Sequence, residues 1–518
     1  MPSMRRFYNG IQLESMPTLN SFFIVIVCFI ASILQSCKSE KKQHITSQFQ
    51  HILDSTYTTN PKALGILVHV EAPEHNISWS GAAGHSNKES KEVLEPEVPI
   101  LIASNTKTYV AAAVLKLVEE EKFSLDDSIQ QLIQAPTNDL LTQNGYTTGQ
   151  ITVRHLLSHT SGIADYVDAN YFDLVNAQPQ HQWSRDEQIA RAMEIADPLA
   201  APGIEFSYAD VNYLLLTEII ERQSDEPFYS AIKHLLQFEK HGLKNTWFIN
   251  LEEAPQGALP LAHQYWDKYN WDSYELNPSW DLYGGGGLVA TANDLAAFFQ
   301  LLFEGKIITD QELLSELHNY VLPSSKSNYC LGLRNIVFHG ATGYYHGGFW
   351  GTDALYFPVF NASLSACTLQ KDERSLNERL HADMMNVLLN ERLKGLFPVQ
   401  RKHKDSTVKV NRNELSLLYQ KGIRIASVKT ADTMSDYEHT LLIMLMNTGS
   451  LYLPENDSEL NKLYVLFSEN IDKMNYRHEV GNVLEWIPNR GMGMYFPDLD
   501  LDFGGAKTFG WGFFEVMQ

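Results

Sequence analysis

The chain has 518 residues, of which 44% are hydrophobic and 20% are charged, and its formal net charge at pH 7 is −22. This composition is typical of a globular protein and excludes extended disorder, while the length exceeds one ordinary hydrophobic core and predicts at least two folded units. The acidic excess argues against a nucleic-acid partner, because phosphate binding requires a basic surface.

The first residues are typical of an export signal. Arg5 and Arg6 precede an apolar run, FFIVIVCFIASIL, that is shorter than the roughly 20 residues of a comfortable membrane span. The following LQSC, which ends at Cys37, resembles a bacterial lipoprotein box, in which the cysteine is lipidated. We predict a lipoprotein-type signal peptide at 1–37 and a place in the bacterial cell envelope, periplasmic or anchored to the membrane by lipid. Cleavage without lipidation and an uncleaved anchor are the alternatives.

A polar tether is predicted next, at 38–60. The segments ALGILVHVEA and ISWSGAAGHS then read as two strands joined by the turn PEHN. The next segment, ILIASNTKTYVAAAVLKLVEE, begins as a strand and continues as a helix, with an apolar stripe at a period of 3.6 residues. A sheet therefore starts before the first long helix.

Ser104 and Lys107 lie where this helix begins. Positions three apart share a helix face, so the amine of Lys107 can reach the Ser104 hydroxyl. A serine hydroxyl needs a neighbouring proton acceptor to become a nucleophile, and a helix N-terminus favours the negative charge that develops. The pair is therefore a candidate nucleophile and base, although the same spacing also occurs in helices without chemistry.

The middle of the chain, from about 125 to 280, alternates helical segments with loops and predicts a helical subdomain. A glycine-rich turn, a strand and a helix capped by Thr291 or Asn293 follow. Three β-prone segments, YCLGLRNIVF, YYHGGFWGTDALYFP and ASLSACTLQ, precede a last helix, NERLHADMMNVLLNERL. Within the middle, the aromatic stretch QYWDKYNWDSYELNPSWDLY either lines a substrate cleft or covers the subdomain.

Residues 399–518 are predicted to form a separate small domain, to which the sequence assigns no chemistry. It opens with QRKHKDSTVKVNR at 400–412, which we interpret as a solvated linker. Two cysteines remain in the folded part, Cys330 and Cys367, and they either pair or stay as buried thiols.

Two further patterns are better explained by structure than by chemistry. His155 and His159 are four apart in HLLSHTSGI, but no third metal ligand accompanies them. The glycines at 284–287 are not followed by the Lys-Ser/Thr of a phosphate loop, so we predict a tight turn beside the active site.

Five blocks occur in order: IASNTKTYVAAAVLKLVEEEKFSLDD, HLLSHTSGI, PGIEFSYADVNYLLLTEIIE, GGGGLVATANDLAAFF and HGGFWGT. Together they resemble the serine β-lactamase and penicillin-binding-protein-like family, closest to the branch of class C β-lactamases, D-aminopeptidases, alkaline D-peptidases and related esterases. The resemblance covers roughly 63–396. It implies an α+β fold, an antiparallel sheet flanked by helices with a mostly helical subdomain, in a catalytic domain at 61–398.

The resemblance also implies the roles of further residues. Tyr208, in FSYADVNY, falls at the position of the catalytic tyrosine, where a phenol can accept or relay a proton. His346 opens HGG, a variant of the Lys-Thr-Gly triad, and is expected to donate to Tyr208 or to a substrate carboxylate, with a cationic form near neutral pH. Gly347 and Gly348 leave the strand edge open to substrate, and the N–H of Phe349 joins that of Ser104 in an oxyanion hole.

The family pattern is broken at Asp210, where an asparagine is usual. An amide donates to a substrate carbonyl, whereas an ionised carboxylate only accepts. Two hypotheses follow: anionic acyl donors are disfavoured, and Lys107 tends to stay protonated.

These observations predict an exported serine hydrolase that forms an acyl-enzyme on Ser104, without metal or organic cofactor. Its substrate is a small-molecule or peptide acyl donor: an ester, a D-amino-acid amide or peptide, or less favourably a β-lactam. No Gly-x-Ser-x-Gly or His-Glu-x-x-His motif points to another hydrolase class. The alternatives are an envelope binding protein with weak turnover and a peptidoglycan DD-peptidase.

Overall fold

The computed structural model describes residues 41–338, 341–396, 407–411, 493–496 and 510–517. The chain divides into two units, Met1–Gln48 and Phe49–Gln518. The predicted signal peptide and most of the predicted C-terminal domain lie outside the described residues. Within the described ranges, no helix has both the length and the apolar character needed to cross a membrane.

Residues 41–59 form a helix, so the tether predicted at 38–60 is wrong over this range. Phe49 and Leu53 are fully buried, and the ring of Phe49 packs on Trp79 with centroids 5.5 Å apart. Their spacing of four places both side chains on one helix face. The polar residues around them concealed this short apolar stripe in the sequence.

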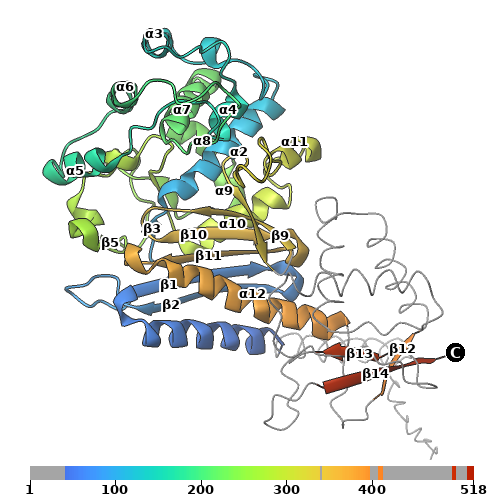
Figure 1. The fold of residues 1–518 in the computed structure, drawn as a ribbon. Helices are drawn as coiled ribbons and strands as arrows, with labels where there is room; N and C mark the ends of the chain where they lie inside the picture. The colour runs from blue at the N-terminus through green and yellow to red at the C-terminus, as the bar shows by residue number, and fades with distance from the viewer. Residues whose placement is uncertain (1–40, 339–340, 397–406, 412–492, 497–509, 518) are drawn as a thin grey trace, which may run out of the picture. The chain divides into compact units, whose positions relative to one another are not determined.

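One six-stranded antiparallel sheet, in the order β2-β1-β11-β10-β9-β8, combines the two ends of the catalytic region (Figure 1). Its strands are β1 (Gly65–Ala72), β2 (Ile77–Gly84), β8 (Arg334–Phe338), β9 (Ala341–Gly347), β10 (Thr352–Phe357) and β11 (Ala362–Thr368). Ile66 lies opposite Thr368, so the first strand closes on the last. The predicted sheet, built from strands on both sides of a helical middle, is confirmed.

Helices cover both faces of this sheet. The hydroxyls of Ser363 and Ser365 on β11 donate to carbonyls of α10 (Ala292–Phe303), whereas Thr368 donates to Asn377 of α12 (Ser375–Leu396). Because side chains alternate along a strand, these bonds place α10 and α12 on opposite faces. The N-cap of α10 is Thr291, one of the two predicted caps, and its side chain accepts from the N–H of Asp294.

The predicted helical middle is confirmed. Its helices are α3 (Ala135–Gln143), α4 (Val153–Leu157), α5 (Ala169–Ala177), α6 (Arg185–Ile195), α7 (Val211–Ser224), α8 (Phe228–Leu235) and α9 (Phe238–His241). Three short strands form a second, small sheet. β7 (Leu288–Ala290) is its central strand and pairs with β4 (Thr246–Phe248) and with β3 (Ile100–Leu101). The chain between β4 and β7 also forms the hairpin of β5 (Tyr265–Trp266) and β6 (Trp271–Asp272).

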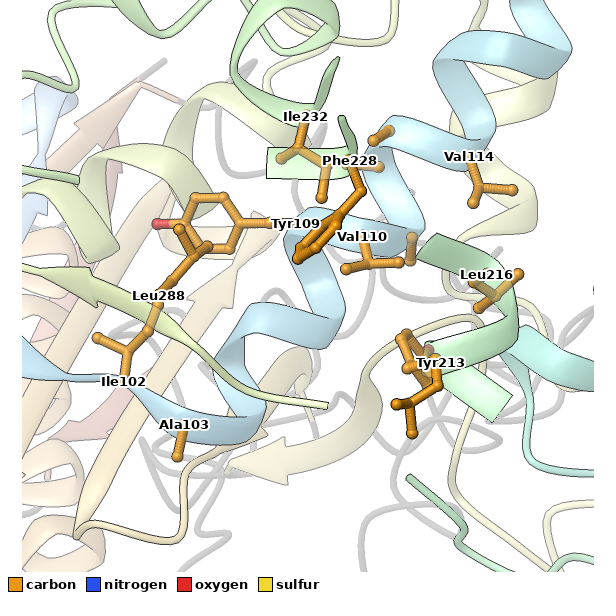
Figure 2. Close-up of a cluster of buried hydrophobic side chains, with 14 of the residues drawn as sticks. Ile102, Ala103, Tyr109, Val110, Val114, Tyr213, Leu216, Phe228, Ile232 and Leu288 are labelled. Atoms are coloured by element: carbon orange, nitrogen blue, oxygen red, sulfur yellow. The ribbon is translucent and has the colours of Figure 1, made fainter. Parts of the chain in front are cut away.

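The helix that follows the Ser104 turn, α2 (Thr106–Glu119), lies in the hydrophobic core. Figure 2 shows Tyr109, Val110 and Val114 meeting side chains of α7, α8 and β7. Tyr109 also stacks on Phe298 with ring centroids 3.5 Å apart. Burial extends beyond the predicted stripe and includes Lys107, so the start of α2 is held rigidly from all sides.

Both remaining cysteines are buried and unpaired. Burial raises the pKa of the Cys330 thiol to about 12 and moves that of Cys367 in the same direction. The sequence left open whether Cys330 and Cys367 form a disulfide or stay as buried thiols, and in the structure they are buried thiols.

Beyond α12, the described residues form a three-stranded sheet, β12-β14-β13. Its strands are β12 (Thr407–Asn411), β13 (Gly493–Phe496) and β14 (Gly510–Met517). The end of the segment interpreted as a charged linker is therefore a strand, consistent with the alternation in TVKVN. The separate domain at 399–518 stays a prediction.

Candidate active site

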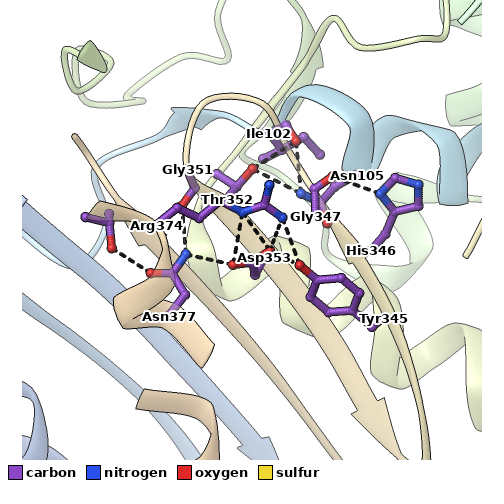
Figure 3. Close-up of polar contacts among 11 residues, drawn as sticks. Ile102, Asn105, Tyr345, His346, Gly347, Gly351, Thr352, Asp353, Arg374 and Asn377 are labelled. Atoms are coloured by element: carbon purple, nitrogen blue, oxygen red, sulfur yellow. Dashed lines mark hydrogen bonds and ion pairs between the residues drawn. The ribbon is translucent and has the colours of Figure 1, made fainter. Parts of the chain in front are cut away.

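Ser104 lies in a single turn of 3-10 helix, Ala103–Asn105, between β3 and α2, at the seam that the sequence indicated. Ala103 has φ +45°, a left-handed conformation that costs free energy in a residue other than glycine. Two hydrogen bonds through the Thr352 hydroxyl hold the turn: Asn105 Nδ2 donates to Thr352 Oγ1 at 3.0 Å, and Thr352 Oγ1 donates to the Ile102 carbonyl at 3.0 Å (Figure 3). The backbone around Ser104 is therefore fixed by β10.

Lys107 is completely buried and has three polar neighbours. Its Nζ lies 3.0 Å from Ser104 Oγ, 2.6 Å from Asp210 Oδ1 and 2.5 Å from the carbonyl oxygen of Gly285. The carboxylate and the carbonyl can only accept, while the serine hydroxyl can accept or donate. An ammonium therefore donates to all three, and a neutral amine can donate to two and take the proton of Ser104 with its lone pair.

Tyr208 lies on the same hydroxyl. Its side chain hydrogen bonds to Ser104, and Lys107 Nζ is 5.1 Å from the centre of its ring. Burial and the Asp210 carboxylate raise the pKa of the Tyr208 phenol well above its usual value. The environment therefore favours a phenol that keeps its proton, so Tyr208 is better suited to donate a proton than to accept one.

Asp210 is the N-cap of α7, but its side chain makes no capping bond and is turned to Lys107 instead. The capping role belongs to Asp165, whose Oδ1 accepts from the backbone N–H groups of Asp210 at 2.8 Å and Val211 at 3.4 Å. Burial and Asp210 raise the pKa of Asp165 well above its ordinary value, and raise that of Asp281 to about 8. The site thus contains three neighbouring carboxyl groups.

Sequence reasoning missed Asp165 and Asp281. No spacing rule connects them to Asp210, because each comes from a different loop and only the fold brings them together. It also missed Gly285 as a partner of Lys107, although it placed the glycine turn beside the active site. Gly284 there has φ +93°, and a Cβ on it would lie 2.6 Å from Thr217 Cγ2.

His346 does not have the predicted environment. Its Nε2 lies 3.0 Å from the hydroxyl of Tyr329 and its Nδ1 lies 3.0 Å from the carbonyl oxygen of Gly347, so both ring nitrogens have partners other than Tyr208. Burial and Lys107 lower the pKa of His346 well below its usual value. The expectation of a cationic histidine near neutral pH is therefore wrong: it did not foresee how deeply the ring is buried beside a lysine.

Gly347 and Gly348 are required by close packing. A Cβ on Gly347 would lie 1.6 Å from Arg374 Nη2, and one on Gly348 would lie 2.3 Å from the carbonyl oxygen of Ile102. Gly348 therefore places the turn carrying Phe349 directly against the turn carrying Ser104. The ladder between β8 and β9 runs only to Tyr345, consistent with the predicted open edge at His346 and Gly347.

The N–H groups of Ser104 and Phe349 remain our prediction for the oxyanion hole. The aromatic stretch at 264–283, which the sequence predicts either to line a substrate cleft or to cover the subdomain, contributes aromatic rings that pack around Phe349. The Phe349 ring lies 5.1 Å from Trp266 and 5.2 Å from Trp280, and it stacks on Phe172 at 5.7 Å. An aromatic wall thus stands beside the predicted oxyanion residue.

The cation closest to the HGG strand is already neutralised. Arg374 donates to Asp353 and, at 2.8 Å, to the hydroxyl of Tyr345, while Asn377 donates to Asp353 Oδ2 at 3.0 Å (Figure 3). The Asp353 side chain is only 6% exposed. With Lys107 paired to Asp210 and Arg374 paired to Asp353, neither cation is free to bind a substrate carboxylate.

The fold and the Ser104–Lys107–Tyr208 arrangement define the class of the protein: a β-lactamase-like serine hydrolase. A family model described as Beta-lactamase matches residues 59–366. The chain therefore belongs to the beta-lactamase family, as the ordered motifs predicted.

Similar proteins agree with this assignment. Penicillin-binding protein 4* of Bacillus subtilis is 22% identical over 290 residues, which are 52% of this chain and 58% of that protein. The D-amino acid amidase from Ochrobactrum anthropi SV3 has a TM-score of 0.56 at 22% identity, covering 67% of this chain and 99% of its own. EstCE1, a hydrolase with promiscuous acyltransferase activity, has a TM-score of 0.55 at 20% identity and the same coverage. The chain spans 42% to 62% of the length of the curated relatives it matches.

Proposed function

We propose that the protein hydrolyses esters or amides through an acyl-enzyme on Ser104. The observation that carries this proposal is the convergence of Lys107 Nζ and the Tyr208 phenol on one serine hydroxyl. In the neutral form Lys107 takes the proton of Ser104 as Oγ attacks the acyl carbonyl carbon. Tyr208 protonates the leaving oxygen or nitrogen and regains its proton from the Lys107 ammonium, which returns to the neutral amine. Lys107 then takes a proton from the water that attacks the acyl carbonyl carbon, and Ser104 Oγ leaves with that proton as the acid is released.

Within this activity, we propose an acyl donor that is neutral or carries an amine, such as a D-amino-acid amide. Asp165, Asp210 and Asp281 lie together beside the nucleophile. Because the pKa values of Asp165 and Asp281 are raised, Asp210 is the carboxylate that favours a cationic group and disfavours an anionic one near neutral pH. A penicillin, or a peptide that presents a C-terminal carboxylate to a DD-peptidase, is accordingly a less favoured substrate than an ester or an amino-acid amide.

The test is intact-mass spectrometry after exposure to a fluorophosphonate and, separately, to a short-chain ester. We expect one adduct on the native protein, no adduct on the Ser104→Ala variant, and ester turnover by the native protein alone. Absence of both adducts in protein shown to be folded would contradict the proposal.

A binding protein with little turnover is the second candidate, and the contact of 2.6 Å between Lys107 and Asp210 favours it. A carboxylate at this distance stabilises the ammonium form, in which lysine cannot act as a base. The same labelling experiment separates the two candidates, because only the hydrolase reacts at Ser104.

We also propose that the protein works in the bacterial cell envelope, attached by a lipid on Cys37. The support is the apolar run and the LQSC sequence near the N-terminus. In a bacterial host, the native protein should fractionate with membranes and a Cys37→Ser variant should not. Equal membrane association of both would contradict lipidation at this position.

A further inference from the structure

The segment HLLSHTSGI, interpreted above as structural, brings one of its histidines to the catalytic tyrosine. His159 follows α4, is fully buried and has φ +55°. Its ring lies against that of Tyr208, with centroids 4.2 Å apart and an angle of 35° between the planes. His159 is thus a buried residue other than glycine with a left-handed backbone, beside a reactive group. Strained residues persist only where the surrounding structure holds them, and they cluster at functional sites.

His159 also holds the backbone on both sides of Tyr208. Its carbonyl accepts from the N–H of Ser207 at 2.9 Å, and its Nδ1 accepts from the N–H of Ala209 at 3.2 Å. One residue thus binds the chain immediately before and immediately after the tyrosine. His155, the other histidine of the segment, instead accepts from the N–H of Thr152 in the capping box of α4.

The hydrogen bonds fix the form of the His159 ring. Because the Ala209 N–H can only donate, Nδ1 must be unprotonated. The amide of Asn212 lies 3.2 Å from the same nitrogen, and Ser161 donates to the Asn212 oxygen at 2.7 Å, which orients that amide with its NH₂ toward the ring. Burial and Lys107 lower the pKa of His159 well below its usual value, in agreement with a neutral ring.

We infer that His159 is a positioning residue for Tyr208: it fixes the backbone on both sides of the tyrosine and the plane of its ring, so that the phenol stays on the Ser104 hydroxyl. The inference rests on the proposed hydrolase function and adds to it. A proton donor that shifts by a fraction of an ångström loses much of its effect, so the consequence should appear in kcat rather than in KM.

Two substitutions separate the contacts. His159→Phe keeps a planar ring against Tyr208 but removes the acceptor for the Ala209 N–H. His159→Asn places Oδ1 where histidine has Nδ1 and suits a left-handed conformation. We expect the Phe variant to lose kcat by about 100-fold with KM changed less than about threefold, and the Asn variant to stay within about tenfold of the native kcat. His155→Phe is the matched control and should keep the native kcat.

A double-mutant cycle with Tyr208→Phe distinguishes positioning from general structural damage. If His159 acts through the phenol, His159→Phe should lower ester turnover by less than about threefold when the phenol is already absent. His159→Ala provides a second cycle that does not require a phenyl ring to fit. An equal loss in both backgrounds, or native kcat in His159→Phe, would overturn the inference alone. Absence of fluorophosphonate labelling in the folded native protein would overturn the proposed function and, with it, the inference.

Discussion

Asp210 determines what Lys107 can do. Where an asparagine would donate a neutral hydrogen bond, this chain places a carboxylate 2.6 Å from the lysine ammonium, and two more carboxyl groups lie behind it. The Asp210 carboxylate and the Gly285 carbonyl keep the lysine in place by accepting its hydrogen bonds. With the pKa values of Asp165 and Asp281 raised, the Asp210 carboxylate is the negative charge that we expect a bound acyl donor to meet. Substrate charge should therefore control turnover strongly.

Asp210→Asn tests this directly. With D-alanine p-nitroanilide and its N-succinyl derivative as a matched amine and anion pair, the native protein should prefer the amine. The variant should change the ratio of the two kcat/KM values toward the anion by about tenfold, because one negative charge is removed from the site. Asp139→Asn, at an exposed position, is the control, and an unchanged ratio in Asp210→Asn would refute the electrostatic explanation.

Asp281 should make stability depend on pH. Its folded pKa of about 8 lies above the ordinary value of 3.8, so between these values the folded protein holds a proton that the unfolded chain releases. Unfolding is then favoured as pH rises from about 4 to about 8. Asp281→Asn should raise the free energy of unfolding at pH 7 by about 4 kcal/mol and lose this advantage near pH 4, as measured by urea denaturation. An advantage that is independent of pH would contradict the assignment.

Predictability differs sharply among these residues. Ser104 and Lys107 could be placed from the sequence because their relation is local: they lie three positions apart where the 3-10 turn passes into α2. Asp165 and Asp281 could not, because they meet Asp210 only through loops that the fold brings together. His346 was located but its protonation was not, since burial by Tyr329 and its neighbours leaves no local sequence signal.

At the scale of elements, the site depends on two turns in contact. The Gly348 turn after β9 touches the turn of Ser104 through the Ile102 carbonyl, with no space for a side chain. Gly348→Ala should therefore push the turns apart and lower kcat for an ester by about 100-fold, with a smaller effect on KM. Gly149→Ala is a useful control for loss of a glycine, because a Cβ there would meet only the end of the exposed Gln130 side chain. Native kcat in Gly348→Ala would show that the turns can separate without consequence.

The start of α12 is joined to β9 and β10 by Arg374 and Asp353. Removing the guanidinium leaves the Asp353 carboxylate buried without its cation, so Arg374→Ala should lower the free energy of unfolding by about 3 kcal/mol. Adding Asp353→Asn should recover part of this loss, because the amide carries no charge. A double variant less stable than Arg374→Ala alone would contradict the explanation.

Most elements could be predicted because their patterns are regular. β1 is a short apolar run of β-prone residues that a polar turn separates from β2, and α2 has a helical period. The helix at 41–59 was missed because its apolar residues are few and separated by polar ones, and because their partner, Trp79, lies in a strand that the pattern alone does not connect to them. Propensity identifies such a helix only when its tertiary partner is known.

At the scale of the whole molecule, the predicted domain boundaries can be tested by truncation. A chain of residues 41–398 should fold and label with fluorophosphonate, because the residues of the sheet and the site lie within it. A chain of residues 61–398 should be less stable by several kcal/mol, since it exposes the surface that Phe49 and Leu53 cover. Equal melting temperatures for the two chains would show that the helix at 41–59 adds nothing to stability.

The bond from Thr352 to the Ile102 carbonyl, described above as a support for the Ser104 turn, joins groups 250 residues apart. The first strand likewise pairs with the last, β11. Such long-range pairing forms slowly and late. A ribosome must therefore complete nearly the entire catalytic region before the serine acquires its surroundings. Until folding is complete, Ser104 therefore lacks the surroundings that the proposed hydrolysis requires. We expect activity to begin only in the compartment where folding is completed.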